Sequence, residues 1–335
     1  MTHITTVTPN PSLDDTLLLD RLPSVAGSGD IHGEEFVSAD LLQTPGGKGS
    51  NCARAAVRLS LEATAICASG GWEGQRHGEL LEESGVSIEQ AQLGCPLRRH
   101  TTLVAREPET VVRRYRTGPA GGRGKVADPD LFQKEMLCRA EESLRNGTDV
   151  LACTGSLPVG AVQELYPTLL AKAREAGTFT ALDASGEVLT SALPARPSLL
   201  KINSEEASAL SEKRTESWEK ALLVAKEVRE SWHLEHVWIT LGGLGAVGAG
   251  EGYEISLSSP KVQALSAVGC GDAFLAGWLC GFVTGGDPER AGRLAIATAA
   301  ANAEGWAPAG FDKSRVHALY KDTGTMSTGD PNEKL

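Results

Sequence analysis

The chain has few aromatic residues and no long hydrophobic run, and both absences narrow its class. Phe, Trp and Tyr make up only 5% of its 335 residues. No stretch of about 18 consecutive apolar residues exists, so we expect no membrane partner. The seven cysteines are scattered without the paired spacing of a metal site, which predicts reduced thiols and a cytoplasmic location. His3–Val7 has a strand pattern with no basic or apolar leader before it, so we expect no targeting segment.

Positive charge is also scarce. The chain has 32 Lys and Arg against 43 Asp and Glu, a net charge of −11, which argues against nucleic acid as a partner. An anionic substrate therefore needs a local basic site. One basic stretch runs from Arg98 to Lys125, with only Glu107 and Glu109 opposing it. Because neighbouring strand residues point to opposite faces, only part of this stretch can line one site, and the rest are expected to be solvated strand-edge charges.

The most informative segment combines a glycine turn, an acidic residue and an apolar helix pattern. Gly269, Cys270 and Gly271 precede Asp272 and a run of apolar residues. The turn and the helix start predict an anion site built from the amides of these three residues. A carboxylate beside an anion suits a general base that takes a proton from a hydroxyl during phosphoryl transfer. The alternatives are an ordinary turn in which Asp272 only caps the helix, and a reactive Cys270 thiolate, which has no evident histidine partner.

A second glycine segment lies far upstream, and together the two resemble a known family. Gly46–Ala53 follows the pattern Gly-Gly-Lys-Gly-x-Asn-x-Ala, and Ser60 and Gly70 come after it. This segment resembles the first signature of the PfkB-type carbohydrate kinases of the ribokinase superfamily, and Val268–Gly277 resembles the second. In the usual second signature an alanine stands where this chain has Cys270, a small residue for a small one.

The resemblance is closest to the hexose-phosphate branch of that family. The supporting segments are Thr8–Asp14, Thr154–Pro158, Leu182–Glu187 and Lys201–Glu206. The resemblance implies a ribokinase-like α/β fold with three α/β/α layers, a mostly parallel central sheet and a small β-sheet lid. It also implies ATP and Mg²⁺ as cofactors and a homodimer formed through the lid.

Local patterns predict the same class independently. Short apolar runs indicate buried parallel strands, and polar helical stretches lie between them, as in α/β proteins. The strands are expected at 64–68, 150–153, 179–183, 199–202 and 237–241, and the helices at 130–145, 161–176, 218–230 and 291–304. Residues 12–44 and 96–117 are extended and half-polar, with a hairpin at 97–104 and 111–116, which predicts the lid. We expect one kinase domain over 1–322 and a disordered tail over 323–335.

The resemblance places an acceptor site at the first glycine segment. Asp14 and Asn51 are implied to bind sugar hydroxyls. Arg99 and Ser156 are implied to hold a phosphate already on the sugar, a task for which arginine is well suited. The remaining acceptor residues are Gly46, Gly47 and Lys48. Without the resemblance, Asp14 is a turn residue and Asn51 a buried helix amide.

The resemblance also implies a nucleotide and metal site. Asn203 and Glu206 are implied to order Mg²⁺, although the same spacing forms a helix capping box. The implied nucleotide contacts are Lys201, Asn203, Thr240, Gly242, Gly245 and, on the helix at 291–304, Asn302.

Two departures touch the acceptor site. Gly27–Gly33 lacks the lysine or arginine common in the branch, and Gly118–Lys125 is longer and richer in glycine than its counterpart. We therefore expect an ATP-dependent kinase of a phosphorylated ketohexose, with fructose 1-phosphate first, giving fructose 1,6-bisphosphate, and tagatose 6-phosphate or fructose 6-phosphate next. The alternatives are a kinase of an unphosphorylated sugar or nucleoside, and a catalytically silent sugar-phosphate sensor.

Overall fold

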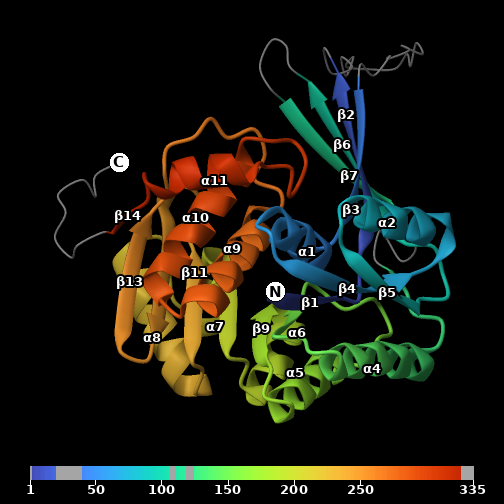
Figure 1. Cartoon of the computed structure of the whole chain (residues 1–335). Helices are drawn as coiled ribbons and strands as arrows, with labels where there is room; N and C mark the ends of the chain where they lie inside the picture. Colours follow the sequence, from blue (N-terminus) through green and yellow to red (C-terminus); the bar gives the residue numbers. More distant parts are fainter. Residues whose placement is uncertain (1, 20–39, 106–110, 118–123, 326–335) are drawn as a thin grey trace.

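The computed structural model describes residues 2–19, 40–105, 111–117 and 124–325. This part of the chain forms a large sheet with helices on both faces and a second, smaller sheet that stands away from it (Figure 1). The predicted three-layer α/β/α arrangement with a separate lid is confirmed.

The large sheet has ten strands in the order β14-β13-β12-β11-β10-β9-β8-β1-β4-β5. The pairs from β5 to β11 are parallel, and β12, β13 and β14 are antiparallel. All five predicted strands are present. The bounds are β1 His3–Thr8, β4 Glu62–Ser69, β5 Ser87–Gln92, β8 Val150–Thr154, β9 Phe179–Asp183, β10 Leu199–Asn203, β11 His236–Thr240, β12 Gly245–Gly250, β13 Tyr253–Ser258 and β14 Gly324–Thr325.

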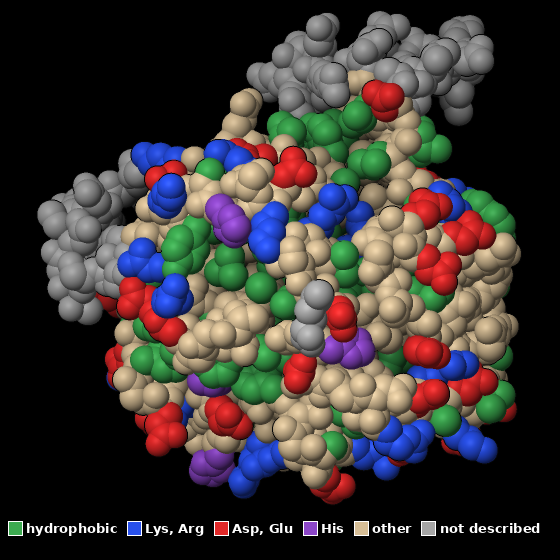
Figure 2. All heavy atoms as spheres, viewed as in Figure 1, with side chains coloured by type: hydrophobic (Ala, Val, Ile, Leu, Met, Phe, Trp, Pro, Cys, Tyr) green, Lys and Arg blue, Asp and Glu red, His purple; other side chains and the backbone are tan. Residues whose placement is uncertain are grey.

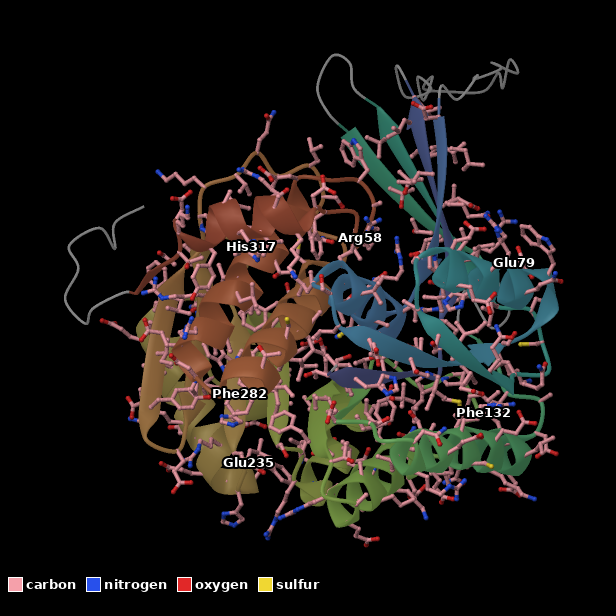
Figure 3. The ribbon with its side chains drawn as sticks, in the orientation of Figure 1. Arg58, Glu79, Phe132, Glu235, Phe282 and His317 are labelled. Atoms are coloured by element: carbon pink, nitrogen blue, oxygen red, sulfur yellow. The ribbon has the colours of Figure 1, made fainter. Side chains whose placement is uncertain are left out.

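The helices divide between the two faces of this sheet. One core contains α1, α9 and α10, with Trp278. The other contains α4, α5 and α8, with Phe132, which Figure 3 labels on α4. The bounds are α1 Lys48–Arg58, α2 Gly71–Glu83, α4 Pro129–Arg145, α5 Leu165–Glu175, α6 Gly186–Ala192, α7 Ser204–Ser211, α8 Trp218–Trp232, α9 Cys270–Gly285, α10 Pro288–Ala303 and α11 Lys313–Tyr320.

Local signals explain most of these boundaries. Asp128 caps α4 by accepting from the Leu131 N–H at 3.1 Å, and Pro129 occupies the first helical position, where its missing N–H costs nothing. The helix predicted at 161–176 begins only at Leu165, because residues 158–161 form a turn closed from Ala161 N to Pro158 O.

The lid is a four-stranded sheet in the order β3-β2-β6-β7. Its strands are β2 Ser12–Leu19, β3 Asp40–Gly46, β6 Arg98–Ala105 and β7 Val111–Thr117. The antiparallel pair β6–β7 is the predicted hairpin, and β2 joins β6 in parallel. The lid therefore brings the two predicted segments together above α1 and α2 (Figure 1).

Several expectations fall at the edges of the described residues. Gly324–Thr325, predicted as the start of a disordered tail, instead pairs with β13. Gly27–Gly33 and residues 118–123 lie outside the described residues. No helix in the described ranges combines the length and apolar character needed to cross a membrane.

Candidate active site

The candidate site forms where several elements end or begin together. Strands β8, β9 and β10 end at Thr154, Asp183 and Asn203, and α1 and α9 start beside those ends. In open α/β sheets ligands bind in the crevice at the carboxyl ends of the strands. The fold thus brings the two glycine segments, more than 200 positions apart, to one place.

Asp272 lies in the first turn of α9, in the position predicted for a general base. Its side chain is buried, and Oδ2 accepts a 2.8 Å hydrogen bond from Asn51 Nδ2. Burial raises the pKa of Asp272 to about 6, and Asp183 adds to the rise, whereas Lys48, Asn51 and Lys201 oppose it. A carboxylate with this pKa is ionised at neutral pH and still basic enough to accept a proton.

Two glycines shape the start of α9, Gly269 at its N-cap and Gly271 in its first turn. Gly269 has φ +78°, a conformation that glycine adopts without strain. A Cβ at position 271 would lie 2.6 Å from Lys201 Nζ. The absence of a side chain therefore lets the Lys201 ammonium approach the start of α9, where unpaired N–H groups and the helix dipole also favour an anion.

Cys270 already has partners in this structure. Its backbone N–H donates to Ala267 O at 3.3 Å, and its role as a donor to a phosphoryl group stays a prediction. Burial raises the pKa of its thiol, although Asn302 donates to the sulfur. A raised pKa argues against the reactive-thiolate alternative. The N–H groups of Gly271 and Asp272, in the same first turn, remain the candidate donors.

A buried ion network joins the two halves of the site. Asp183 Oδ1 accepts from Lys48 Nζ at 2.6 Å, and Asp183 Oδ2 accepts from Lys201 Nζ at 2.9 Å. Burial would raise the pKa of Asp183, but the two lysines hold it below its usual range. Sequence reasoning did not select Asp183. The available signal was an acid at the end of a buried strand, where a charge requires partners.

Asn203 and Glu206 form the capping box that was the alternative to a metal site. Asn203 Oδ1 accepts from the Glu206 N–H at 2.8 Å, and Glu206 Oε2 accepts from the Asn203 N–H at 2.9 Å. The other oxygen, Glu206 Oε1, lies 3.3 Å from Lys48 Nζ. Asn203 is therefore occupied as a cap, whereas Glu206 also faces the ion network.

A pocket opens beside this network. Asn10 Nδ2 donates to Ser156 Oγ at 3.0 Å, and Arg98 Nη2 donates to Asn10 O at 2.9 Å. Its cations are Lys48 and Arg98. The pocket is lined by Thr8, Asn10, Lys48, Arg98, Thr154, Gly155, Ser156 and Ser185.

Arg98 lines the pocket, whereas the predicted phosphate ligand was Arg99. Arg99 pairs with Asp15 and lies over the Trp72 ring, 5.9 Å from its centre, whereas Arg98 lines the pocket. Alternation along β6 does put the two arginines on opposite faces, as expected. The sequence holds no signal for which face turns inward, because that depends on the pairing of Ser12 with Arg98.

The first glycine segment is packed tightly against the lid. A Cβ at Gly46 would lie 2.5 Å from Asp14 Cγ, and Gly47 has φ +118°. Asp14 Oδ1 lies 3.2 Å from His100 Nδ1 of β6. Asp14, Gly46 and Gly47 therefore gather beside Asn51 as predicted, and His100 joins them without having been predicted.

His77 of α2 supports this segment from behind and was also missed. Its Nε2 lies 3.1 Å from both Gly46 O and Ser50 Oγ, and the side chain is fully buried. Because Gly46 O can only accept, Nε2 carries a proton. Burial lowers the pKa of His77 to about 4, so the ring is neutral at physiological pH.

Three of the predicted nucleotide residues lie around the turn between β11 and β12. Thr240 ends β11, and Gly242 lies in the following 3₁₀ turn, Gly242–Leu244, with φ +60°. Gly245 starts β12 with φ +124°, and a Cβ there would lie 2.0 Å from Leu257 O. A glycine at this position therefore allows the close pairing of β12 with β13. All three therefore lie at or after the end of β11, which pairs with β10, the strand that carries Lys201.

Asn302 is a brace rather than the predicted wall of an adenine pocket. It is 1% exposed. Its Nδ2 donates to Val268 O at 2.9 Å, and its Oδ1 accepts from the Ala309 N–H at 2.7 Å. Its polar atoms therefore hold the turn before α9 in place.

Comparisons with known proteins agree with this geometry. Residues 28–305 match the model of a family described as pfkB family carbohydrate kinase. A 1-phosphofructokinase of Haloferax volcanii is 29% identical over 88% of this chain and 89% of its own. ATP-dependent 6-phosphofructokinase isozyme 2 of Escherichia coli strain K12 is 28% identical over 82% of this chain and 84% of its own. The crystal structure of phosphofructokinase-2 from Escherichia coli in complex with potassium has a TM-score of 0.82 at 25% identity, covering 96% of this chain and 99% of that one.

Proposed function

The chain belongs to the pfkB family of carbohydrate kinases, and on that premise we propose that it phosphorylates a ketohexose that already carries a phosphate. The first candidate is fructose 1-phosphate, which would give fructose 1,6-bisphosphate and ADP. The observation that carries this proposal is the pocket where Lys48, Arg98 and Ser156 meet, since the charge of Lys48 also acts on Asp272 and lowers its pKa. Relatives named 1-phosphofructokinase and 6-phosphofructokinase support it.

Family membership settles the coarser points. The chain is an ATP-dependent carbohydrate kinase with a ribokinase-like fold, which solved neighbours share. The identity of its acceptor and the role of each residue are proposed here from the geometry.

Asp272 is proposed as the general base. Its carboxylate takes the proton of the acceptor hydroxyl as that oxygen bonds to the γ-phosphorus and the bond from phosphorus to the leaving ADP oxygen breaks. Asn51 holds the carboxylate in place through its 2.8 Å hydrogen bond. Lys201 and the free amides at the start of α9 stabilise the negative charge of the transferring group.

Asp183 and Glu206 are the residues best suited to hold Mg²⁺. Their carboxylate oxygens are the hard ligands that this ion prefers, and Lys48 brings one oxygen from each to a single cation. Bound Mg²⁺ supplies positive charge to the nucleotide phosphates. Asn203 supports Glu206 as a cap rather than as a ligand.

Arg98, Ser156 and Lys48 are proposed to hold the phosphate already on the sugar. A coupled assay of ADP formation over hexoses and hexose phosphates tests this. Turnover of hexose phosphates alone supports the proposal. Turnover of the parent sugars or nucleosides favours the first alternative, and binding without ADP formation favours the sensor.

The lid is proposed to form a homodimer interface. Strand β3 is an edge of the lid sheet, and its Leu41 is 63% exposed. Trp72 of α2, which packs against β3, is 55% exposed. An edge strand with an apolar surface is a pairing site unless it is covered. The predicted cytoplasmic location stays a prediction.

A further inference from the structure

Lys48 belongs to two neighbouring groups of residues at once. Its Nζ lies 2.6 Å from Asp183 Oδ1 and 3.3 Å from Glu206 Oε1. The same side chain lines the pocket that contains Arg98 and Ser156. Lys48 therefore stands between the carboxylates suited to a metal and the cavity suited to the acceptor phosphate.

The two lysines on Asp183 differ in their freedom to move. The Lys201 side chain is only 4% exposed. Its ammonium packs so closely on Gly271 that a Cβ there would lie 2.6 Å from Nζ. The Lys48 side chain is 33% exposed. Gly155, with φ +83°, lies beside the aliphatic part of Lys48, and a Cβ at position 155 would lie 3.7 Å from Lys48 Cβ. Lys201 is thus fixed, whereas Lys48 has space on the pocket side.

The negative charges of Asp183 and Glu206 attract Lys48 as long as no other cation is bound to them. Burial works against its charge, but Asp183 and Glu206 raise the pKa of Lys48 above its ordinary value. The two carboxylates therefore favour the charged form of the Lys48 side chain. A divalent cation on the same two oxygens would remove this attraction and add repulsion.

We propose that Lys48 alternates between these two partners and so couples the metal half of the site to the acceptor half. With the carboxylates bare, Lys48 neutralises them. With a divalent cation on Asp183 and Glu206, Lys48 turns into the pocket and binds the acceptor phosphate beside Arg98. This inference rests on the proposed function, because it needs a phosphorylated acceptor. Since such coupling is reciprocal, each ligand strengthens the other by the same factor, typically about 5- to 150-fold.

The competition between Lys48 and the metal is tested without any sugar. Titration with MnCl₂, followed by EPR as a stand-in for Mg²⁺, compares the wild type with Lys48→Met. The variant should bind Mn²⁺ about tenfold more tightly, because the cation shared by Asp183 and Glu206 is gone and Asp183 keeps only Lys201. Lys172→Met removes a surface lysine that pairs with Glu141, and it should match the wild type. Equal Mn²⁺ affinity in wild type and Lys48→Met overturns the inference, whatever the acceptor is.

The coupling itself is measured by calorimetry with fructose 1-phosphate, with and without MgCl₂ at constant ionic strength and without nucleotide. Mg²⁺ should tighten binding of the sugar phosphate at least about fivefold in the wild type and in Lys172→Met, but not in Lys48→Met. Binding that is independent of Mg²⁺ in the wild type, or equal coupling in Lys48→Met, overturns the inference. Failure of the wild type to bind any hexose phosphate overturns the proposed acceptor instead, and the Mn²⁺ titration still judges the role of Lys48.

Discussion

Asn51 and Asp272, which lie 221 positions apart, are joined by a 2.8 Å hydrogen bond from the Asn51 amide to the Asp272 carboxylate. Asn51 belongs to the first turn of α1 and Asp272 to the first turn of α9. The contact links the segment proposed to bind the acceptor to the residue proposed to activate it. We therefore expect the amide to orient the proposed base while the adjoining loop holds the acceptor.

Asp272→Asn should remove basicity with little change of shape. We expect kcat to fall by about 10²–10⁴, with the nucleotide Kd nearly unchanged, because the loss concerns a group that acts in the transition state. Steady-state kinetics and nucleotide binding measure the two quantities. A variant with near-normal turnover would contradict the assignment.

The pH profile should report the pKa of Asp272, which burial raises to about 6. Below that pH the carboxyl is protonated and cannot act as a base, so kcat/KM for the acceptor should fall about tenfold per pH unit. Asn51→Leu removes a bond that lowers this pKa, so the acid limb should move to higher pH. If the acid limb of the kcat/KM profile stays at the same pH in Asn51→Leu, a group other than Asp272 is responsible for it.

Arg98 and Arg99 form a matched pair of neighbours on opposite faces of β6. Arg98→Ala should raise KM for a phosphorylated acceptor about tenfold to a hundredfold, since charged hydrogen bonds are worth about 1.5–3 kcal/mol. Arg99→Ala, which loses the contacts to Asp15 and Trp72, should change KM little. Kinetics on fructose 1-phosphate and on fructose measure both effects. The reverse order of effects would mean that Arg99 is the phosphate ligand after all.

His77 should act through the position of Gly46 and not through its charge. His77→Gln places an N–H donor where Nε2 stands, so KM for the acceptor should stay within a few fold of the wild type. His77→Leu leaves the Gly46 carbonyl without its partner, at a cost of about 1–3 kcal/mol. KM for the acceptor should rise while KM for ATP does not. Equal rises in both constants for His77→Leu, with no rescue by Gln, would indicate a general loss of structure.

The lid should control the oligomeric state. Leu41→Glu puts a charge on the exposed edge strand β3, far from the ion network, and should shift a dimer toward monomer at micromolar concentration. Sedimentation velocity on the wild type and this variant measures the change. Figure 2 shows acidic and basic side chains interspersed over one face of the molecule. A wild type that is monomeric at these concentrations would rule the interface out.

The sequence predicted the elements of this fold well because their signals are local. The apolar runs at 150–153 and 179–183 became β8 and β9, and the half-polar segments became the lid. The sequence favoured Arg99, whereas the pocket is lined by Arg98, because the inward face of a strand depends on its partner strand. Asn302 failed for a similar reason, since its bonds to Val268 and Ala309 are made by loops that no periodicity describes.

Residues that work through tertiary contacts were the hardest to find. Asp183 and His77 lie outside the two glycine segments, and each acquires its role only when distant parts of the chain meet. Asp183 joins Lys48 to Lys201, and His77 supports Gly46. A buried ionisable residue at the end of a strand or inside a helix was the one available hint, because such groups require partners.

Phosphorus NMR of the purified protein with ATP, MgCl₂ and fructose 1-phosphate tests the central claim most directly. The account predicts the loss of the γ-phosphate signal of ATP and the growth of ADP and fructose 1,6-bisphosphate signals in equal amounts, with Asp272→Asn nearly inactive. If ATP is consumed with unphosphorylated fructose or a nucleoside but with no hexose phosphate, the proposed acceptor is wrong.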